Sequence, residues 1–323
     1  MSERPSVSVA MIAYNNAGVI GEAIRGVVRQ KTDFPVELIV VDDASTDSTL
    51  AVAKEWESRY PDIVHVYSNK VNLGLQRNYF EAFSHCTGKY LAMCDADDWW
   101  WYRSKLARQV AYMEAHPDCA ITFHPVINYY EADGSKSISN GSQKTDATIA
   151  DLSRSNFITN LSVMYRRGLV DLCALPAWVS EEKLPDYAIH MFYASHGYIH
   201  FMRLPMGVYR MRATATWSTA RRYKRLEMSL SVRERLMEAF SGNKEVVDGL
   251  RQASASILLN MILCGDPRDA GQARDKLQRY PGYETPEKIN DALAARAAFR
   301  EPLMKRVLTP VRRFLSRLVP LPR

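Results

Sequence analysis

Several common features are missing from this sequence. No apolar run approaches the roughly 18 residues that a membrane-spanning helix needs. The N-terminal segment MSERPSVSVAMIAYNN enters a strand-like alternation and lacks the apolar core of a signal peptide. The five cysteines are irregularly spaced, with no C-x-x-C pair and no matching histidine pairs to indicate zinc. We therefore expect a protein of a reducing, cytoplasmic compartment that does not cross a bilayer.

Acidic residues are also nearly absent from two stretches of the chain. The 323 residues are 47% apolar and 24% charged with a net charge of +6, which is typical of a folded soluble protein. Residues 203–225 contain cations and no acid, and residues 301–323 hold six cations against the single Glu301. Such clusters favour nucleic acid, phosphorylated ligands or an acidic membrane as partners; a solvated basic face is the alternative.

The first hundred residues alternate between strand and helix patterns with short connections. This order predicts a parallel sheet with helices on both faces. We expect Gly88 to end a helix in a left-handed conformation and Gly197 to end a later helix. Residues 133–145, rich in Gly, Ser and Asn, are expected to form a loop. The expected strands are 7–13, 36–41, 63–68, 89–94, 119–124, 126–131 and 161–167, with more strand structure in 198–210, and the expected helices are 20–28, 42–57, 74–88, 104–116, 185–197 and most of the chain from 217 onward.

Polar side chains follow three of these strands. In open parallel sheets, ligands bind outside the carboxyl ends of the strands, where loops converge. The sequence therefore predicts one crevice that collects all three groups, which are Tyr14, Asn15 and Asn16, then Asp42 and Asp43, then Asp95, Asp97 and Asp98.

The third group lies in MCDADDWW, where three carboxylates are crowded beside apolar residues at a cost in repulsion and desolvation. A calcium loop of the EF-hand type is excluded, because its sixth position would be Trp100 and its twelfth Leu106. A solvated surface loop without a bound ion is an alternative explanation of the three carboxylates. A magnesium or manganese site fits better, since these ions use few carboxylates and complete their coordination with ligand phosphates.

Five segments together resemble, in order and spacing, the inverting family 2 glycosyltransferases of the GT-A fold. They are VSVAMIAYN, VELIVVDDASTDST, NLGLQRN, YLAMCDADDWW and PDY, and the resemblance covers about residues 5–215. It implies a GT-A catalytic domain, with a Rossmann-like, mostly parallel sheet, over residues 1–215. Residues 216–323 would form a helical C-terminal region.

The resemblance also implies roles for individual residues. Asp97, with Asp98 as a competitor, would hold Mn²⁺ or Mg²⁺, which stabilises the departing diphosphate. Asp95 would meet the ribose or the metal, and Asp43, with Asp42 beside it, would accept from N3 of uracil. A helix-capping turn is the alternative for Asp42 and Asp43. The rest of the expected nucleotide site is Ala13, Tyr14, Asn15, Arg77 and Ala96.

Arg77 is expected near the diphosphate, because a cation in the first turns of a helix opposes the helix dipole unless an anion is close. Many relatives carry a histidine two residues after a Tyr-Arg pair, whereas this chain has Arg212 there. That departure puts metal binding at the position in doubt, so Arg210 and Arg212 are weaker candidates for phosphate contacts. Trp99 and Trp100 are weak candidates for packing on a sugar, although some of these rings would be core.

An inverting transfer needs a carboxylate that takes a proton from the attacking hydroxyl. Asp186 in EEKLPDYAIHM matches the family's base position. Glu181 and Glu182 are nearby alternatives, and Asp186 could instead be an N-terminal helix acid.

The last residues, 301–323, form a cationic amphipathic segment interrupted by Pro310. Such a segment can lie in an anionic leaflet, or it can pack on the core or on another subunit. We expect a peripheral cytoplasmic glycosyltransferase that extends a surface glycan from a UDP-sugar, with a lipid-linked acceptor on the inner face of the membrane and without nucleic acid. A polyprenyl-phosphate sugar synthase and a non-catalytic nucleotide- or glycan-binding protein are the alternatives, and a homo-oligomer is left open.

Overall fold

The computed structural model describes residues 6–212 and 222–303. Of these, the residues up to 152 and from 156 to 211 form one compact unit, here called the N-terminal unit. Residues 153–155 and the described residues from 212 onward form the second, the C-terminal unit. The two units are described separately.

An eight-stranded sheet organises the N-terminal unit, in the order β3-β2-β1-β4-β10-β6-β11-β9. The first four strands of this order run parallel to one another, whereas β10 is antiparallel to both β4 and β6. The four strands formed by the first hundred residues are parallel, as expected, and the sheet as a whole is mixed because β10 is antiparallel to its neighbours. Its strands are β1 (Val7–Ala13), β2 (Val36–Asp42), β3 (Val64–Ser68), β4 (Tyr90–Met93), β6 (Cys119–Phe123), β9 (Asp146–Ala147), β10 (Met164–Arg166) and β11 (Tyr198–Phe201).

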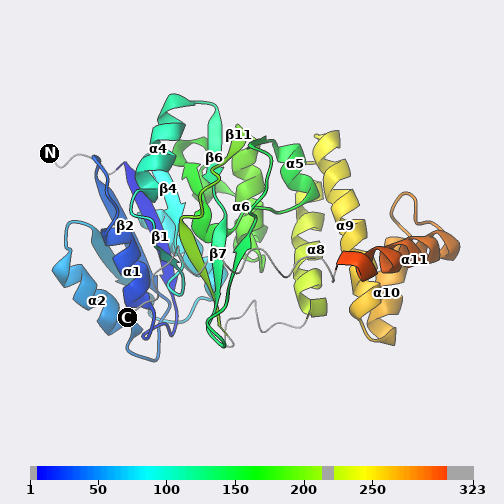
Figure 1. Cartoon of the computed structure of the whole chain (residues 1–323), viewed down its shortest axis with the longest axis horizontal. Coiled ribbons are helices and arrows are strands. Elements are labelled where there is room, and N and C mark those ends of the chain that lie inside the picture. Colours follow the sequence, from blue (N-terminus) through cyan, green and yellow to red (C-terminus); the bar gives the residue numbers. More distant parts are fainter. Residues whose placement is uncertain (1–5, 213–221, 304–323) are drawn as a thin grey trace. The chain divides into compact units, whose positions relative to one another are not determined.

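The apolar runs of the sequence become the central strands because both faces of the sheet are covered. Every residue of β1 is buried, as expected for a strand of a parallel sheet with helices on both sides. β1 and β2 pair from Val7 with Val36 to Ala13 with Asp42, so both strands end at the same edge. Figure 1 shows β1, β2 and β4 side by side with helices around them. The longer helices of this unit are α1 (Ile20–Val28), α2 (Thr49–Arg59), α3 (Leu75–His85), α4 (Lys105–Ala115) and α6 (Pro185–Ala194).

Gly88 and Gly197 do not end the helices as expected, and Gly88 does not adopt the expected left-handed conformation. α3 ends at His85 and α6 at Ala194, and neither glycine is among the described residues with positive φ. Both are instead required by close packing of the chain. A Cβ at Gly88 would lie 2.6 Å from the backbone N of Ser8, and one at Gly197 would overlap the carbonyl of Asp118.

A second sheet, in the order β5-β12-β7-β8, lies in the same unit. Its strands are β5 (Trp99–Trp100), β7 (Val126–Tyr130), β8 (Lys136–Ser139) and β12 (Gly207–Met211). β8 falls inside the expected loop 133–145, where it pairs antiparallel with β7, and the Asn128 side chain also bonds the hydroxyls of Ser137 and Ser139 across the hairpin. The short helix α5 (Ile149–Arg154) and the one-turn helix η1 (Asn160–Ser162) follow.

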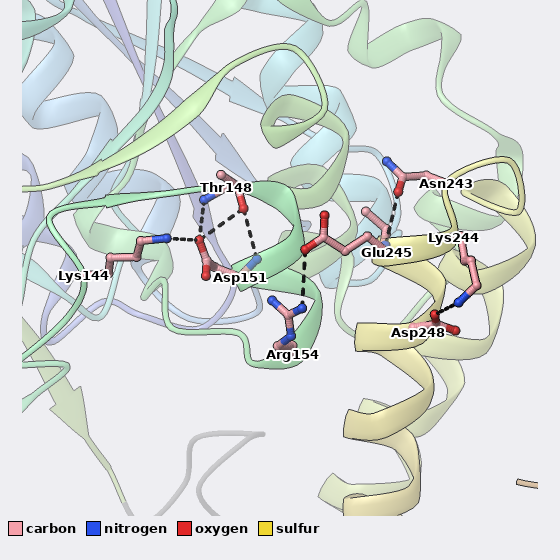
Figure 2. A network of polar contacts seen from close by, with 9 residues as sticks. Lys144, Thr148, Asp151, Arg154, Asn243, Lys244, Glu245 and Asp248 are labelled. Atoms are coloured by element: carbon pink, nitrogen blue, oxygen red, sulfur yellow. Dashed lines mark hydrogen bonds and ion pairs between the residues drawn. The ribbon is translucent and has the colours of Figure 1, made fainter. Parts of the chain in front are cut away.

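The C-terminal unit is helical in its described residues. A shared apolar cluster that includes Leu230, Leu258 and Leu277 joins these helices. Within this unit, Arg154 pairs with Glu245 at 3.5 Å and the Asn243 side chain caps the start of α9 (Figure 2). The helices are α8 (Arg222–Ala239), α9 (Lys244–Cys264), α10 (Pro267–Leu277) and α11 (Pro286–Leu303).

The part of the chain that the structure describes contains no helix both long and apolar enough to span a membrane. From residue 304 on, the expected amphipathic tail lies outside the described residues.

Candidate functional site

The loops after β1 and β2 meet at one edge of the main sheet. The amide of Asp43 donates to the carbonyl of Ala13 at 2.8 Å. Asn15, at φ 54°, accepts from the amide of Thr46 at 2.9 Å through its side-chain oxygen. Tyr14 is 47% exposed beside them. Three residues of the expected nucleotide site, Ala13, Tyr14 and Asn15, therefore line the same edge as Asp42 and Asp43.

Asp43 organises the segment that leads into α3. Its carboxylate accepts from the Asn69 side chain, from the amide of Leu73 and from the amide of Gly74, each at 2.8 Å. Both oxygens are thus engaged, although a carboxylate has about four acceptor positions and some capacity remains. Asp42 differs, because its Oδ1 is buried and has no hydrogen-bond partner among the described residues.

Arg77 lies on the first turn of α3, and its side chain is exposed. No hydrogen bond or ion pair joins its guanidinium to another described residue. A cation in this position opposes the positive end of the helix dipole. The position therefore suits an external anion.

Asp95, directly after β4, is held by two side chains from distant segments. Tyr79 donates its hydroxyl to Asp95 at 2.6 Å, and the Asn160 amide donates to both Asp95, at 3.4 Å, and the Tyr79 hydroxyl oxygen, at 2.9 Å. Burial raises the pKa of Asp95 to about 7, with further contributions from Asp97 and Asp186, even though the two hydrogen bonds lower it. A carboxylate in this state is stabilised in its charged form by any cation that approaches it.

Asp98 has a structural environment rather than that of a metal ligand. Its Oδ1 accepts from the amide of Arg210 at 2.9 Å, and the residue is only 2% exposed. Burial raises its pKa well above the usual range, and the charges of Asp97 and Asp95 raise it further. Asp97 is more exposed than Asp98, and Ala96 between the acids is anchored by its amide to the carbonyl of Ile12 at 3.2 Å. Asp97 is therefore the better candidate for the metal.

Across residues 6–212 and 222–303, no three His, Cys, Asp or Glu side chains are arranged to hold a metal by themselves. Magnesium and manganese bound with a nucleotide need only one or two carboxylates, because phosphate oxygens and water complete the coordination. Asp95 and Asp97 supply carboxylate oxygens whose mutual repulsion a cation would relieve. The residues present therefore fit such an ion, with its remaining ligands supplied by substrate.

Arg210 is committed to the protein itself. Its guanidinium pairs with Glu22 and, at 3.0 Å, with Glu131, and its Nε donates to the carbonyl of Asp97 at 2.9 Å. With all these donors engaged and the side chain 7% exposed, the suggested phosphate contact is corrected to a structural role. Arg212, just beyond β12, is grouped with the C-terminal unit, and its phosphate contact remains a prediction.

Trp99 and Trp100 are core residues, not sugar platforms. They form β5 and are 7% and 3% exposed. The Trp100 indole donates to the carbonyl of Leu161 at 2.9 Å, and the buried ammonium of Lys105 lies 3.9 Å from its ring centroid. The Trp99 ring is covered by the Arg210 guanidinium at 4.6 Å. No open face of either ring remains for a sugar.

Asp186 occupies the first turn of α6, directly after Pro185. Burial raises its pKa, and backbone N–H groups at the helix start lower it. Its charge in turn contributes to the raised pKa of Asp95 and of Tyr79. Asp186 of α6 therefore interacts electrostatically with the acidic loop (Asp95–Asp98), although 91 positions separate Asp186 from Asp95 in the sequence. Of its expected rivals, Glu181 is exposed and Glu182 is 8% exposed.

The sequence profile described as glycosyl transferase family 2 matches residues 8–172. The chain belongs to this family. A protein of Mycobacterium tuberculosis is 37% identical over 217 residues, which is 66% of this chain and 61% of the relative. The matched region thus spans about three fifths of that relative. The minor teichoic acid biosynthesis protein GgaB of Bacillus subtilis is 35% identical over 94 residues, 28% of this chain and 10% of GgaB.

Solved structures of other glycosyltransferases have the same fold as this family 2 chain. S. aureus TarS, solved in complex with UDP-GlcNAc, superposes with a TM-score of 0.63 at 18% identity, covering 89% of this chain and 83% of that chain. The mannosyltransferase PcManGT from Pyrobaculum calidifontis, in complex with GDP-Man and Mn²⁺, gives 0.54 at 20% identity, covering 92% and 87%. The expected GT-A fold is confirmed.

Three side chains at this family 2 site were not found from the sequence, namely Tyr79, Asn160 and Tyr209. Tyr79 and Asn160 hold Asp95, and the charges of the acids contribute to the raised pKa of Tyr209. No motif marks them, because each is one polar residue on an otherwise ordinary helix, turn or strand. Only the long-range pairing of these elements brings them to Asp95.

Proposed function

We propose that this chain is an inverting, metal-dependent glycosyltransferase that moves a sugar from a UDP-sugar to a lipid-linked glycan acceptor. The observation that carries the proposal is the placement of Asp186 close enough to Asp95 for their charges to interact, on a different element. An inverting transfer needs one carboxylate for the acceptor and a separate anchor for the leaving group. Asp186 and the loop Asp95–Asp97 supply these two parts.

The residues then divide the reaction between them. Asp186 takes the proton of the acceptor hydroxyl, and its raised pKa makes it a stronger base than an exposed aspartate. Arg77 provides a permanent positive charge for the diphosphate. Asp97, with Asp95 beside it, would hold Mn²⁺ or Mg²⁺, which when bound neutralises charge on the leaving diphosphate. Ala13, Tyr14, Asn15, Asp42, Asp43 and Ala96 line the nucleotide site.

The printed names of similar proteins support the choice of substrates. TarS was solved with UDP-GlcNAc, and GgaB is named for teichoic acid biosynthesis, so a UDP-sugar and a surface polymer are the natural candidates. The proposal places the enzyme on the inner face of the cytoplasmic membrane, with the cationic residues of 301–323 against anionic lipid. Vesicle co-sedimentation of the full chain, with and without these residues, tests that placement.

The central experiment measures thermal stabilisation by UDP-, dTDP- and GDP-sugars with and without Mn²⁺, followed by transfer from the donor that stabilises most. Asp186→Asn should lower the transfer rate about 10²- to 10⁴-fold while UDP binding persists. Asp97→Ala should abolish transfer and also weaken Mn²⁺-dependent UDP binding. Glu181→Gln, which alters an exposed acid nearby, is the matched control. Full activity of Asp186→Asn would refute the base assignment.

A further inference from the structure

Tyr209 lies in β12 between Val208 and Arg210, which contact β5 and the acidic loop. Val208 pairs with Trp99 of β5, and the amide of Arg210 binds the carboxylate of Asp98. Successive residues of a strand point to opposite faces. The Arg210 guanidinium covers the Trp99 ring, so the Tyr209 side chain projects from the other face of the sheet.

On that face, the Tyr209 ring packs against the core cluster of the N-terminal unit, which includes Ala96 and Leu161. Ala96 lies inside the acidic loop, and Leu161 is the neighbour of Asn160 in η1. β12 also contacts η1, so Tyr209 lies in a strand beside the turn that carries Asn160, a hydrogen-bond partner of Asp95. The place of the ring is set by packing and needs no hydrogen bond from the hydroxyl.

The Tyr209 hydroxyl interacts electrostatically with acids from both parts of the proposed site. Burial raises its pKa, and the charges of Asp98, Asp97, Asp95 and Asp186 raise it further. The hydroxyl therefore stays protonated and can donate a hydrogen bond. No hydrogen bond joins it to any other residue in the described ranges. Tyr79 already donates its one hydroxyl proton to Asp95.

We propose that Tyr209 is a substrate-binding residue whose hydroxyl donates a hydrogen bond to an oxygen of the transferred sugar. This inference rests on the proposed function. In an inverting transfer, the sugar lies between the leaving diphosphate and the base, and Tyr209 lies near the carboxylates that serve both. A neutral donor on an apolar ring suits a sugar, which offers hydroxyl oxygens and flat apolar faces. A diphosphate would instead favour a cation such as Arg77.

The test compares binding of one nucleotide sugar with binding of its nucleoside diphosphate alone, using the donor that gives the largest stabilisation in the panel above. Tyr209→Phe keeps the ring and removes only the hydroxyl. A neutral hydrogen bond contributes about 0.5–1.5 kcal/mol, so the affinity for the nucleotide sugar and kcat/KM should each fall about 2- to 12-fold. The affinity for the diphosphate alone should be unchanged.

Tyr129→Phe is the matched control. Tyr129 of β7 pairs with Arg210 of β12. Its ring lies edge-on to the Trp99 ring, with the ring centroids 5.9 Å apart, on the face of the sheet that carries the Arg210 side chain. Loss of its hydroxyl should change neither affinity.

The outcomes separate the inference from the function on which it rests. If the wild-type chain binds no nucleotide sugar, the proposed function fails. If it binds and transfers, but Tyr209→Phe matches the wild type for both ligands, the contact with the sugar does not exist. An equal loss for sugar nucleotide and diphosphate would place the hydroxyl on the diphosphate, and would also overturn the inference.

Discussion

The carboxylate of Asp98 accepts a hydrogen bond from the backbone amide of Arg210 at 2.9 Å, although 112 positions separate the two residues. The same arginine also binds the carbonyl of Asp97 with its side chain. One residue of β12 therefore fixes two successive residues of the acidic loop. This explains how a cluster of like charges is held in place within the protein.

Substitutions of the adjacent residues Asp97 and Asp98 should have different effects. Asp98→Asn keeps an acceptor oxygen for the Arg210 amide, so we expect an unchanged melting temperature and a manganese requirement within about threefold of wild type. Asp98→Ala leaves that buried amide unpaired and should lower the free energy of unfolding by about 1–3 kcal/mol. Asp97→Asn should raise the manganese requirement more than tenfold with little change in stability. Manganese titration of activity and urea unfolding check these values, and the opposite ranking would make Asp98 the metal ligand.

Arg210 should matter chiefly for stability and for the shape of the loop. Arg210→Gln leaves Glu22, whose side chain is 16% exposed, without its cation, and loss of one partner of a buried pair costs about 3–5 kcal/mol. Arg59→Gln breaks an exposed pair with Glu55 and should cost less than about 1 kcal/mol. Urea unfolding of both variants measures the difference. Equal, small losses would show that the Arg210 network contributes little to stability.

The strands and helices of the first hundred residues could be predicted because the spacing of their apolar residues indicates which positions are buried. VSVAMIA is apolar throughout and forms β1 from Val7 to Ala13, as expected. The composition of residues 133–145 instead predicted a loop. β8 is mostly polar, and it is a strand because it pairs antiparallel with β7, where the Asn128 side chain also bonds two serine hydroxyls. The pairing of this segment with β7 cannot be identified from its composition.

The candidate site was predictable where a motif carries it and not where packing completes it. Asp95, Asp97 and Asp186 follow from strand ends and from the family resemblance. Their surroundings depend on contacts between distant elements, so the sequence could not show that Arg210 faces Glu22 or that Trp100 is covered by Lys105. A basic or aromatic residue near a motif is equally consistent with ligand binding and with the core.

Asp95 should make stability fall as pH rises between about 4 and 7. Its pKa is about 7 in the folded chain and near 3.8 when unfolded, so the folded state holds the proton more tightly in this range. Stability from this group is complete below pH 4 and is lost as pH rises through 7. Each pKa unit corresponds to about 1.4 kcal/mol, so the loss is on the order of a few kcal/mol.

The measurement is urea unfolding of wild type and Asp95→Asn at several pH values between 4 and 8. Other groups also titrate in this range, so the difference between the two proteins is the relevant quantity. The free energy of unfolding of the wild type should fall relative to that of Asp95→Asn as pH rises, and the difference should level off above pH 7. A constant difference would mean that Asp95 titrates normally in the folded protein.

The contact between α1 and the strand after the acidic loop should tolerate no added methyl group. A Cβ at Gly26 would lie 2.9 Å from both the backbone N and the backbone O of Trp100. Alanine favours a helix over glycine by about 1 kcal/mol, but overpacking against rigid backbone costs about 1–3 kcal/mol. Gly26→Ala should therefore be destabilising overall and, because β5 follows Asp98 directly, should also lower the transfer rate.

Gly18→Ala is the control for this substitution, because a Cβ there would meet nothing within 4 Å. It should leave both the melting temperature and the transfer rate unchanged. Differential scanning calorimetry and a steady-state assay with saturating manganese compare the two variants. If Gly26→Ala is as stable and active as Gly18→Ala, α1 can move away from Trp100 at little cost, and the acidic loop does not depend on this contact for its position.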